Sequence, residues 1–210
     1  MTISINSLEE IYQHVSQDSA LYRQLVPAAK RMAQKCASAA EIGVLHMHSS
    51  FGILFGLSKS SQKPRSYLGI DISPPPEQCL NAAKIWAQEA EIDFNFIQAN
   101  DLDITLDPVD FLLIDSYHTY RHLTYELETF APSVRSYILL HDTGYPWGTI
   151  DENESNPNME NESRYPDHIN RTKRGVWPAV IDYLDQHPEW KIYERDFSNA
   201  GITIIQRLNS

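Results

Sequence analysis

The sequence alternates short β-prone runs with helical patterns from about residue 39 onward, and this alternation restricts the fold more than any other feature. Apolar runs separated by helices are typical of a parallel sheet with both faces covered. The five runs, in order, are AAEIGVL, RSYLGIDI, IDFNFIQA, VDFLLID and SYILLHD. Two later runs, WKIYERDF and GITIIQRL, lie close together around Gly201 and predict an antiparallel hairpin. The sequence therefore predicts an α/β fold with a seven-stranded sheet.

Helical patterns fill the chain before and between these runs. Apolar residues in the first 35 residues repeat at helical spacing, which predicts two helices ahead of the sheet. Further helices are predicted after Ser49, from Glu77 to Ala90 and from His118 to Phe130. We therefore divide the chain into an amino-terminal helical extension, residues 1–35, and an α/β domain, residues 36–210.

Composition excludes several classes of partner. The formal charge of −11 argues against a nucleic-acid-binding surface, because such surfaces neutralise phosphates with Lys and Arg. No apolar stretch is long enough to cross a membrane, and the start, MTISINSLEEIYQ, lacks the layout of a signal peptide, so we expect a cytoplasmic protein. Cys36 and Cys79 lack CxxC spacing, which disfavours a disulfide scaffold or a zinc cluster. A small molecule is the expected partner, and a homo-oligomer is compatible with the sequence.

Polar residues follow each of the parallel runs. Ligands bind at the carboxyl ends of the strands of a parallel sheet, so we expect functional residues there. These segments are Gly43–Ser50, Asp71, Asn100–Asp101, Asp115–His118 and His141–Thr143. Asp71 ends the second run, where a carboxylate either accepts the hydroxyls of a ribose or caps the next helix. Asp101 follows the third run, where it either contacts an adenine edge or caps the next turn.

The fourth and fifth runs end in residues of the types that bind metals. Asp115 ends one run and His141–Asp142 end the other, and adjacent parallel strands would bring these ends together. Mixed nitrogen and oxygen ligands suit a divalent cation such as Mg, Mn, Fe or Zn. His118 would stand over the same edge as a candidate general base, with an ordinary pKa of about 6.5. Each residue taken singly also has a structural explanation, as a helix cap, a buried histidine or a turn residue.

Together these segments resemble a known enzyme family. The ordered set EIGV…SS, YLGIDIS, FIQAND, DFLLIDSYHTYRHLTYEL and YILLHDT, with a closing GVWPAV helix and GITII strand, resembles class I S-adenosylmethionine-dependent methyltransferases. Within them it looks most like small-molecule O-methyltransferases, including macrocin O-methyltransferase-like and cephalosporin hydroxylase-like proteins, from about residue 39 to 207. The resemblance implies a Rossmann-like sheet of seven strands with the last one antiparallel, helices on both faces, and bound S-adenosylmethionine.

The resemblance also implies a role for each matching residue. The implied cofactor-binding positions are Glu41, Gly43, Ser49, Asp71, Asp101 and Asp115. The turn from Glu41 to Gly43 would face the methionine moiety of the cofactor, Asp71 its ribose and Asp101 its adenine region.

Metal-dependent members of the family bind a cation through the acid of the ID segment and the two residues before the Thr of the HDT segment. Those positions are Asp115, His141 and Asp142, and the cation, with Mg as first candidate, would hold the acceptor oxygen and lower its pKa. His118 matches the family histidine near the acceptor, so His118 and Asp115 form the expected catalytic pair. The implied reaction is metal-assisted methyl transfer to a hydroxyl of a small molecule.

Two departures from the family pattern leave another function open. Met47 stands where the family has a second glycine, so its side chain is expected to crowd the cofactor. Ser116 replaces the glycine of the family's IDG segment. The alternative is a non-catalytic binding protein of the same fold, in which the turn at Met47 has closed the cofactor pocket.

A third hypothesis starts from His46 and His48. Residues two apart on a strand point to the same face, so these imidazoles could bind one metal, as in barrel-shaped metal-dependent hydrolases. Such a barrel typically needs about 250 residues and further ligands at later strand ends. The chain is shorter than this and holds no second HxH, which argues against the hydrolase.

The composition changes after Thr143. The segment GYPWGTIDENESNPNMENESRYPDHIN, about residues 144–170, is rich in Asp, Glu, Asn and Pro. A loop of this length in a compact domain is usually either functional or disordered. We expect either a lid over the acceptor or a disordered insertion.

Overall fold

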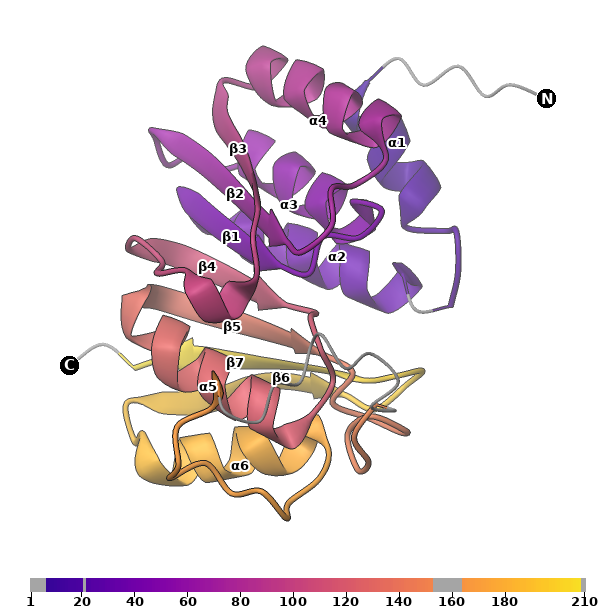
Figure 1. The fold of residues 1–210 in the computed structure, drawn as a ribbon. Coiled ribbons are helices and arrows are strands. Elements are labelled where there is room, and N and C mark those ends of the chain that lie inside the picture. The colour runs from indigo at the N-terminus through magenta and orange to yellow at the C-terminus, as the bar shows by residue number, and fades with distance from the viewer. Residues whose placement is uncertain (1–6, 21, 153–163, 209–210) are drawn as a thin grey trace.

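The computed structural model of the chain describes residues 7–20, 22–152 and 164–208 (Figure 1). Seven strands form one sheet in the order β3-β2-β1-β4-β5-β7-β6. The strands are β1 (Ser38–Ile42), β2 (Arg65–Asp71), β3 (Ile92–Gln98), β4 (Val109–Ile114), β5 (Val134–His141), β6 (Trp190–Asp196) and β7 (Ile202–Arg207). The helices are α1 (Leu8–Val15), α2 (Tyr22–Ala33), α3 (His48–Ser58), α4 (Glu77–Glu89), α5 (Tyr120–Phe130) and α6 (Val176–Gln186), with 3₁₀ turns η1 (Asp101–Asp103) and η2 (Ala131–Ser133).

The pairing of the strands confirms the predicted Rossmann-like architecture. Strands β1 to β5 pair in parallel, whereas β7 pairs antiparallel with both β5 and β6. From β1 the order runs through β2 to β3 on one side and through β4 to β5 on the other. The carboxyl ends of β1 and β4 therefore lie side by side at the point where the strand order reverses, and ligands of such sheets bind in the crevice outside this point.

Helices cover both faces of the sheet, and alternate strand residues face the two layers. In β4, Phe111 and Leu113 belong to the buried cluster beneath α1 to α4, while Leu112 and Ile114 belong to the cluster beneath α5 and α6. Figure 1 shows these helices as two separate groups. The period of two follows from strand geometry, and it explains why a doubly covered strand is almost continuously apolar in sequence.

The two helices predicted in the first 35 residues are α1 and α2, and they join the core on one face of the sheet. Helix α2 packs closely on α3 because glycines of α3 leave room for its backbone. A Cβ on Gly52 would lie 2.7 Å from the carbonyl oxygen of Val26. One on Gly56 would lie 2.4 Å from the carbonyl oxygen of Lys30. The division of the chain into an extension and a domain stays a prediction.

Helix α5 begins at Tyr120, later than the start at His118 that the sequence predicted. Thr119 has an extended backbone, and its hydroxyl accepts a hydrogen bond of 3.2 Å from the N–H of His122. This side chain caps the helix and leaves His118 in the loop after β4, at the carboxyl edge of the sheet. The predicted apolar face of the helix is confirmed, since Phe130 is fully buried.

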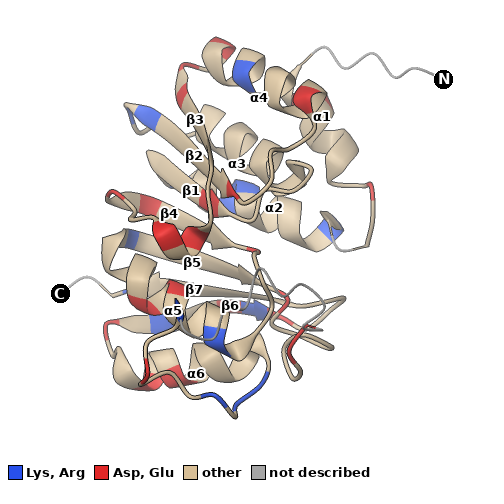
Figure 2. Ribbon diagram, viewed as in Figure 1, with Lys and Arg blue, Asp and Glu red and all other residues tan. Residues whose placement is uncertain are grey.

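Acidic and basic residues of the described chain gather in different places (Figure 2). The turn η1 carries Asp101 and Asp103 at the carboxyl edge of the sheet, whereas Arg171, Lys173 and Arg174 lie in the loop before α6. Among the described residues, no helix is both long and apolar enough to cross a membrane.

Candidate active site

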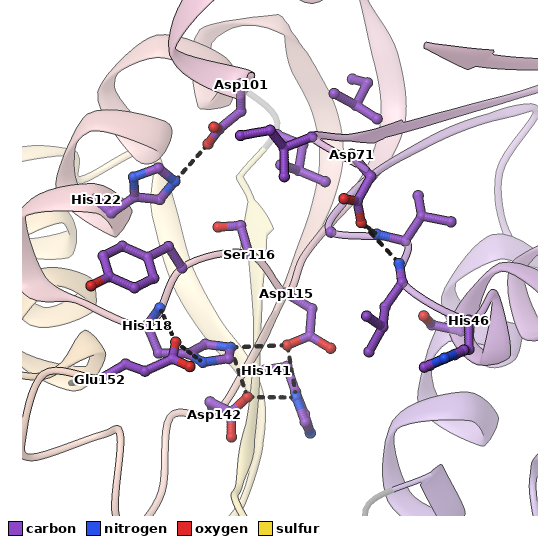
Figure 3. Close-up of a pocket in the computed structure, with 18 of the residues that line it drawn as sticks. His46, Asp71, Asp101, Asp115, Ser116, His118, His122, His141, Asp142 and Glu152 are labelled. Atoms are coloured by element: carbon purple, nitrogen blue, oxygen red, sulfur yellow. Dashed lines mark hydrogen bonds and ion pairs between the residues drawn. The ribbon is translucent and has the colours of Figure 1, made fainter. Parts of the chain in front are cut away.

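A cavity of about 450 Å³ opens at the carboxyl ends of strands β1 to β5 (Figure 3). The predicted site residues that line it are Gly43, Ser49, Asp71, Asp101, Asp115, His118, His141 and Asp142. Glu41 is predicted for the site but does not line the cavity. The structure thus brings residues from five separate strand ends into one space at the reversal of strand order.

The turn after β1 depends on Gly43. Its φ is +85°, and a Cβ there would lie 1.9 Å from the carbonyl oxygen of Asp115. Only glycine lets the backbone pass this close to the end of β4. The N–H groups of Val44 and Leu45 donate to Oδ2 of Asp71 at 2.8 and 2.9 Å. Asp71 therefore ties this turn to the end of β2 while it lines the cavity.

Asp71 retains capacity to accept a ligand hydrogen bond. Its Oδ1 accepts a bond of 2.9 Å from the N–H of Ser73, in addition to the two bonds at Oδ2. A carboxylate has about four lone-pair positions, so one remains for a ribose hydroxyl. The ribose contact of Asp71 stays a prediction.

The expectation that the side chain of Met47 crowds the cavity is wrong. Met47 is 0% exposed and packs in the same core cluster as Phe51, and it is not among the residues that line the cavity. Its φ is +67°, in the left-handed region. Glycine is favoured at such a position because of the backbone conformation, and here a buried methionine adopts it. The turn at Met47 has not closed the pocket.

Glu41 lies in the core behind the cavity. Its Oε2 accepts hydrogen bonds of 2.5 Å from the hydroxyls of Ser50 and Tyr67. Burial raises the pKa of Glu41 to about 7, although these hydroxyls lower it. The predicted contact with the methionine moiety is therefore not available to this side chain, and Gly43 and Ser49 are the members of that turn that reach the cavity.

Two carboxylates and two imidazoles meet at the edge formed by β4 and β5. Nε2 of His118 lies 3.2 Å from Oδ1 of Asp115 and 2.9 Å from Oδ2 of Asp142. Nδ1 of His141 lies 3.0 and 2.9 Å from the same two oxygens. Figure 3 shows the four side chains converging on one point. Asp142 has a φ of +55°, an uncommon conformation for a non-glycine residue that is often found at functional sites.

The carboxylates and imidazoles of this cluster shift one another's pKa values. Burial lowers the pKa of His141, but Asp115 and Asp142 outweigh it and raise the value to about 10. The pKa of His118 is raised well above its ordinary value because hydrogen bonds to carboxylates outweigh burial. Burial raises the pKa of Asp115, but the two imidazoles together bring it well below its ordinary range. The carboxylates therefore favour the protonated form of both imidazoles.

The residues also fit a divalent cation. Asp115, His118 and Asp142 each offer a ligand atom, and these atoms lie within 4.8 Å of one another. Nδ1 of His141 contacts the same two carboxylates. Carboxylate oxygens with imidazole nitrogens are a donor set that binds divalent metals. The sequence assigned His141 as a ligand and His118 as a base, and the structure gives both imidazoles the same pair of partners.

Glu152 contacts this cluster and was not predicted. Its Oε2 lies 3.1 Å from Nδ1 of His118, and its N–H donates to the carbonyl oxygen of His118 at 2.9 Å. The ring of Trp147 stacks on the imidazole of His118, with 6.3 Å between the ring centroids and 14° between the planes. No pattern in the sequence links these residues to His118, because they belong to the polar segment after Thr143.

The polar segment of residues 144–170 is described at both ends. Asp151 accepts hydrogen bonds from the N–H of Tyr120 at 2.9 Å and from that of Gly175 at 2.7 Å. Its first part is thereby held at the start of α5. Residues 153–163, on which the choice between a lid and a disordered insertion depends, lie outside the described residues.

His122 is a second residue that the sequence analysis missed. Its Nε2 lies 2.6 Å from Oδ2 of Asp101, and both residues line the cavity (Figure 3). His122 lies in α5 and His118 in the loop before it, so the four-residue spacing in HTYRH is not a helical repeat and does not indicate the contact with Asp101.

The sequence argued against a metal pair at His46 and His48, and the structure does not place the two residues on a strand. His48 begins α3 and His46 lies in the turn before it, so strand geometry does not put their side chains on one face. Nε2 of His48 pairs with Asp18 at 3.0 Å, and its ring stacks on Tyr22 with 3.9 Å between centroids. The open sheet with two edge strands is also not the barrel that the hydrolase requires.

Solved structures show where this architecture occurs. A protein from Corynebacterium glutamicum is 16% identical, with a TM-score of 0.59 over 100% of this chain and 93% of that one. The O-methyltransferase TomG from Streptomyces achromogenes, solved with SAM and involved in tomaymycin synthesis, is 12% identical, with a TM-score of 0.56 over 100% and 92%. An O-methyltransferase from Bacillus cereus, solved with SAH, is 13% identical, with a TM-score of 0.53 over 99% and 93%. This chain has the methyltransferase fold.

At these identities the likeness concerns the fold alone. No protein-family model matches the sequence, and no curated protein matches it either. The activity therefore has to be argued from the site.

Proposed function

We propose that this protein is an S-adenosylmethionine-dependent O-methyltransferase that acts, with the help of a divalent cation, on a hydroxyl of a small molecule. The observation that carries the proposal is that one cavity holds both the turn at Gly43 and the cluster of Asp115, His118, His141 and Asp142. Proteins of the same fold from Streptomyces achromogenes and Bacillus cereus are O-methyltransferases solved with SAM and SAH. A cofactor half and an acceptor half thus adjoin one another.

In the cofactor half, each strand end offers one kind of contact. The turn at Gly43 and the side chain of Ser49 would face the methionine moiety, where the missing Cβ leaves the backbone accessible. Asp71 would accept from the ribose and Asp101 from the adenine. Asp115 borders both halves, so the methyl group of a bound cofactor would lie beside the acidic cluster.

In the acceptor half, Asp115, His141 and Asp142 would hold the cation. When bound, a divalent cation supplies a Lewis acid that lowers the pKa of the acceptor hydroxyl, and it offsets the carboxylate charges that otherwise keep His118 protonated. His118 accepts the hydroxyl proton at Nε2 while Glu152 holds Nδ1. The methyl group passes in line from sulfur to oxygen, and most of the rate comes from alignment of the two reactants.

The charge of the cavity supports a small acceptor without phosphate. Five carboxylates line it, those of Asp71, Asp101, Asp115, Asp142 and Glu152. Within the described part of the chain, no Lys or Arg lines it. A phosphate-bearing partner such as a nucleic acid would meet these carboxylates without the Lys or Arg side chains that usually neutralise phosphate.

Calorimetric titration with S-adenosylhomocysteine tests the cofactor half. We expect a single binding site. An absence of heat at millimolar ligand would contradict the proposal and would favour the non-catalytic binding protein.

An activity assay tests the acceptor half. It measures the S-adenosylhomocysteine formed from S-adenosylmethionine with each of a panel of hydroxyl compounds, with and without Mg²⁺. Asp142→Ala should lose the Mg²⁺-stimulated reaction and still bind S-adenosylhomocysteine as the unaltered protein does.

A further inference from the structure

A second cluster of polar side chains lies at the end of the cavity assigned to adenine, and the proposed reaction does not use it. Asp101, His122 and Glu126 offer ligand atoms that lie within 4.8 Å of one another. The side chains of His122 and Glu126 are 3% and 1% exposed, so each of their polar atoms needs a partner inside the protein. Asp101 and His122 reach the cavity, whereas Glu126 lies behind them.

His122 is held from both sides. Its Nε2 lies 2.6 Å from Oδ2 of Asp101, and its Nδ1 lies 2.9 Å from the hydroxyl of Tyr165. At this distance a protonated imidazole of His122 forms an ion pair with the carboxylate of Asp101. Figure 3 shows the ring pointing at the carboxylate of Asp101 from α5.

Glu126, the other acid of the cluster, differs from Asp101 in its charge. Burial raises the pKa of Glu126 to about 8; the charge of His122 opposes this rise and the charge of Asp101 adds to it, so the neutral form of Glu126 is favoured near pH 7. Oε1 of Glu126 accepts a hydrogen bond of 2.6 Å from the hydroxyl of Ser116. Burial also raises the pKa of Asp101, but the hydrogen bond and charge of His122 lower it below its ordinary value. Asp101 is therefore the ionised member of the cluster.

We propose that His122 is a positioning residue that makes the cavity selective for a 6-aminopurine, because it holds Asp101 as an ionised carboxylate that can only accept hydrogen bonds. The inference rests on the proposed function, in which Asp101 faces the adenine. The 6-amino group of adenine donates to such a carboxylate, whereas the oxygen of a 6-oxopurine would face it as a second acceptor and leave both unpaired. A protonated Asp101 could donate to that oxygen, so loss of His122 should remove the selectivity.

Calorimetry with S-adenosylhomocysteine and with its 6-oxo analogue, S-inosylhomocysteine, measures this selectivity as a ratio of Kd values. The unaltered protein should prefer S-adenosylhomocysteine by about ten- to a hundredfold, the factor expected for one unpaired buried polar group. His122→Leu should bring the two Kd values to within about threefold of each other. His122→Gln should keep much of the preference, because an amide N–H can still donate to Asp101. Tyr165→Phe should give an intermediate ratio, since it removes the hydroxyl at Nδ1.

A matched control is His168→Ala. This histidine is 64% exposed and pairs with Glu128 at 2.8 Å, outside the cavity, so its loss should leave the ratio unchanged. If His122→Leu does not fold, the Tyr165→Phe variant carries the test.

The outcomes separate the two claims. If the His122→Leu or Tyr165→Phe variant binds both ligands more weakly at an unchanged ratio, His122 is only structural and the inference is overturned. Equal binding of the two ligands by the unaltered protein overturns it as well, while the proposed function stands. If the unaltered protein binds neither ligand, the proposed function itself is contradicted.

Discussion

Replacing Gly43 by Ala should destabilise the protein and also remove cofactor binding. The new Cβ would lie 1.9 Å from the carbonyl oxygen of Asp115, and the residue would have to hold a φ of +85°. The left-handed conformation costs a non-glycine residue about 1–2 kcal/mol, and overpacking costs about 1–3 kcal/mol more. The sum, about 2–5 kcal/mol, corresponds to a fall in Tm of roughly 4–20 °C for a domain of this size.

Differential scanning calorimetry and titration with S-adenosylhomocysteine measure the two effects on the same sample. Since the turn must shift away from Asp115, affinity should fall by at least about tenfold. Gly52→Ala is the matched control, because its Cβ would lie 2.7 Å from the carbonyl oxygen of Val26 between α2 and α3, away from the cavity. This variant should lose stability and keep the affinity of the unaltered protein. A Gly43→Ala protein with unchanged Tm and affinity would refute the reasoning.

Single contacts in the site allow three further tests. Asp142→Ala should weaken Mn²⁺ binding by at least about tenfold in electron paramagnetic resonance titrations, because it removes one of two carboxylates at the cluster, and an unchanged affinity would exclude the cation site. Glu152→Ala should slow the formation of S-adenosylhomocysteine several-fold and leave cofactor affinity intact, since His118 loses its partner at Nδ1. A fall in cofactor affinity instead would contradict this role of Glu152. Burial raises the pKa of Glu41 from 4.5 to about 7, so the folded state binds this proton more tightly than the unfolded state. The free energy of unfolding, relative to Glu41→Gln, should therefore fall as the pH rises from about 4.5 to 7 in urea titrations, and a difference independent of pH would contradict the assignment.

The strands were predictable because burial in the sheet gives them a recognisable pattern of apolar residues in the sequence. A strand covered on both faces needs apolar side chains at nearly every position, as in β4, and each of the five parallel strands overlaps a predicted run. The edge strand β3 is the exception, because it alternates polar residues and is largely exposed. All carboxyl ends of parallel strands meet one edge of the sheet, so Asp71, Asp115 and His141 could be placed at the cavity from their positions at the ends of runs.

The family motif predicted that Glu41 faces the cofactor, whereas the alternation of side chains along β1 predicts that it faces the core. Successive residues of a strand face opposite layers, and Ile42 faces the layer beneath α5 and α6. Glu41 must therefore face the layer beneath α3, where Ser50 and Tyr67 donate hydrogen bonds to its Oε2. The alternation of side chains along the strand was therefore enough to predict the buried position of Glu41.

Other features had no signal in the sequence. The left-handed φ of Met47 is a property of the turn, and a side chain that packs in the core can occupy it. Glu152 reaches His118 across 34 residues of sequence from a segment without periodicity. Tyr165 reaches His122 across 43 residues in the same way. Contacts of this kind depend on how a loop returns to the sheet, which neither spacing nor composition records.

The central claim is that one cavity holds the cofactor and a cation side by side. A crystal structure of the protein grown with S-adenosylhomocysteine and Mn²⁺, with data collected for the anomalous signal of manganese, tests it most directly. The account predicts S-adenosylhomocysteine between the turn at Gly43 and Asp101, and one anomalous peak between Asp115 and Asp142. Crystals that show the cavity free of both, or the manganese bound elsewhere, would contradict it.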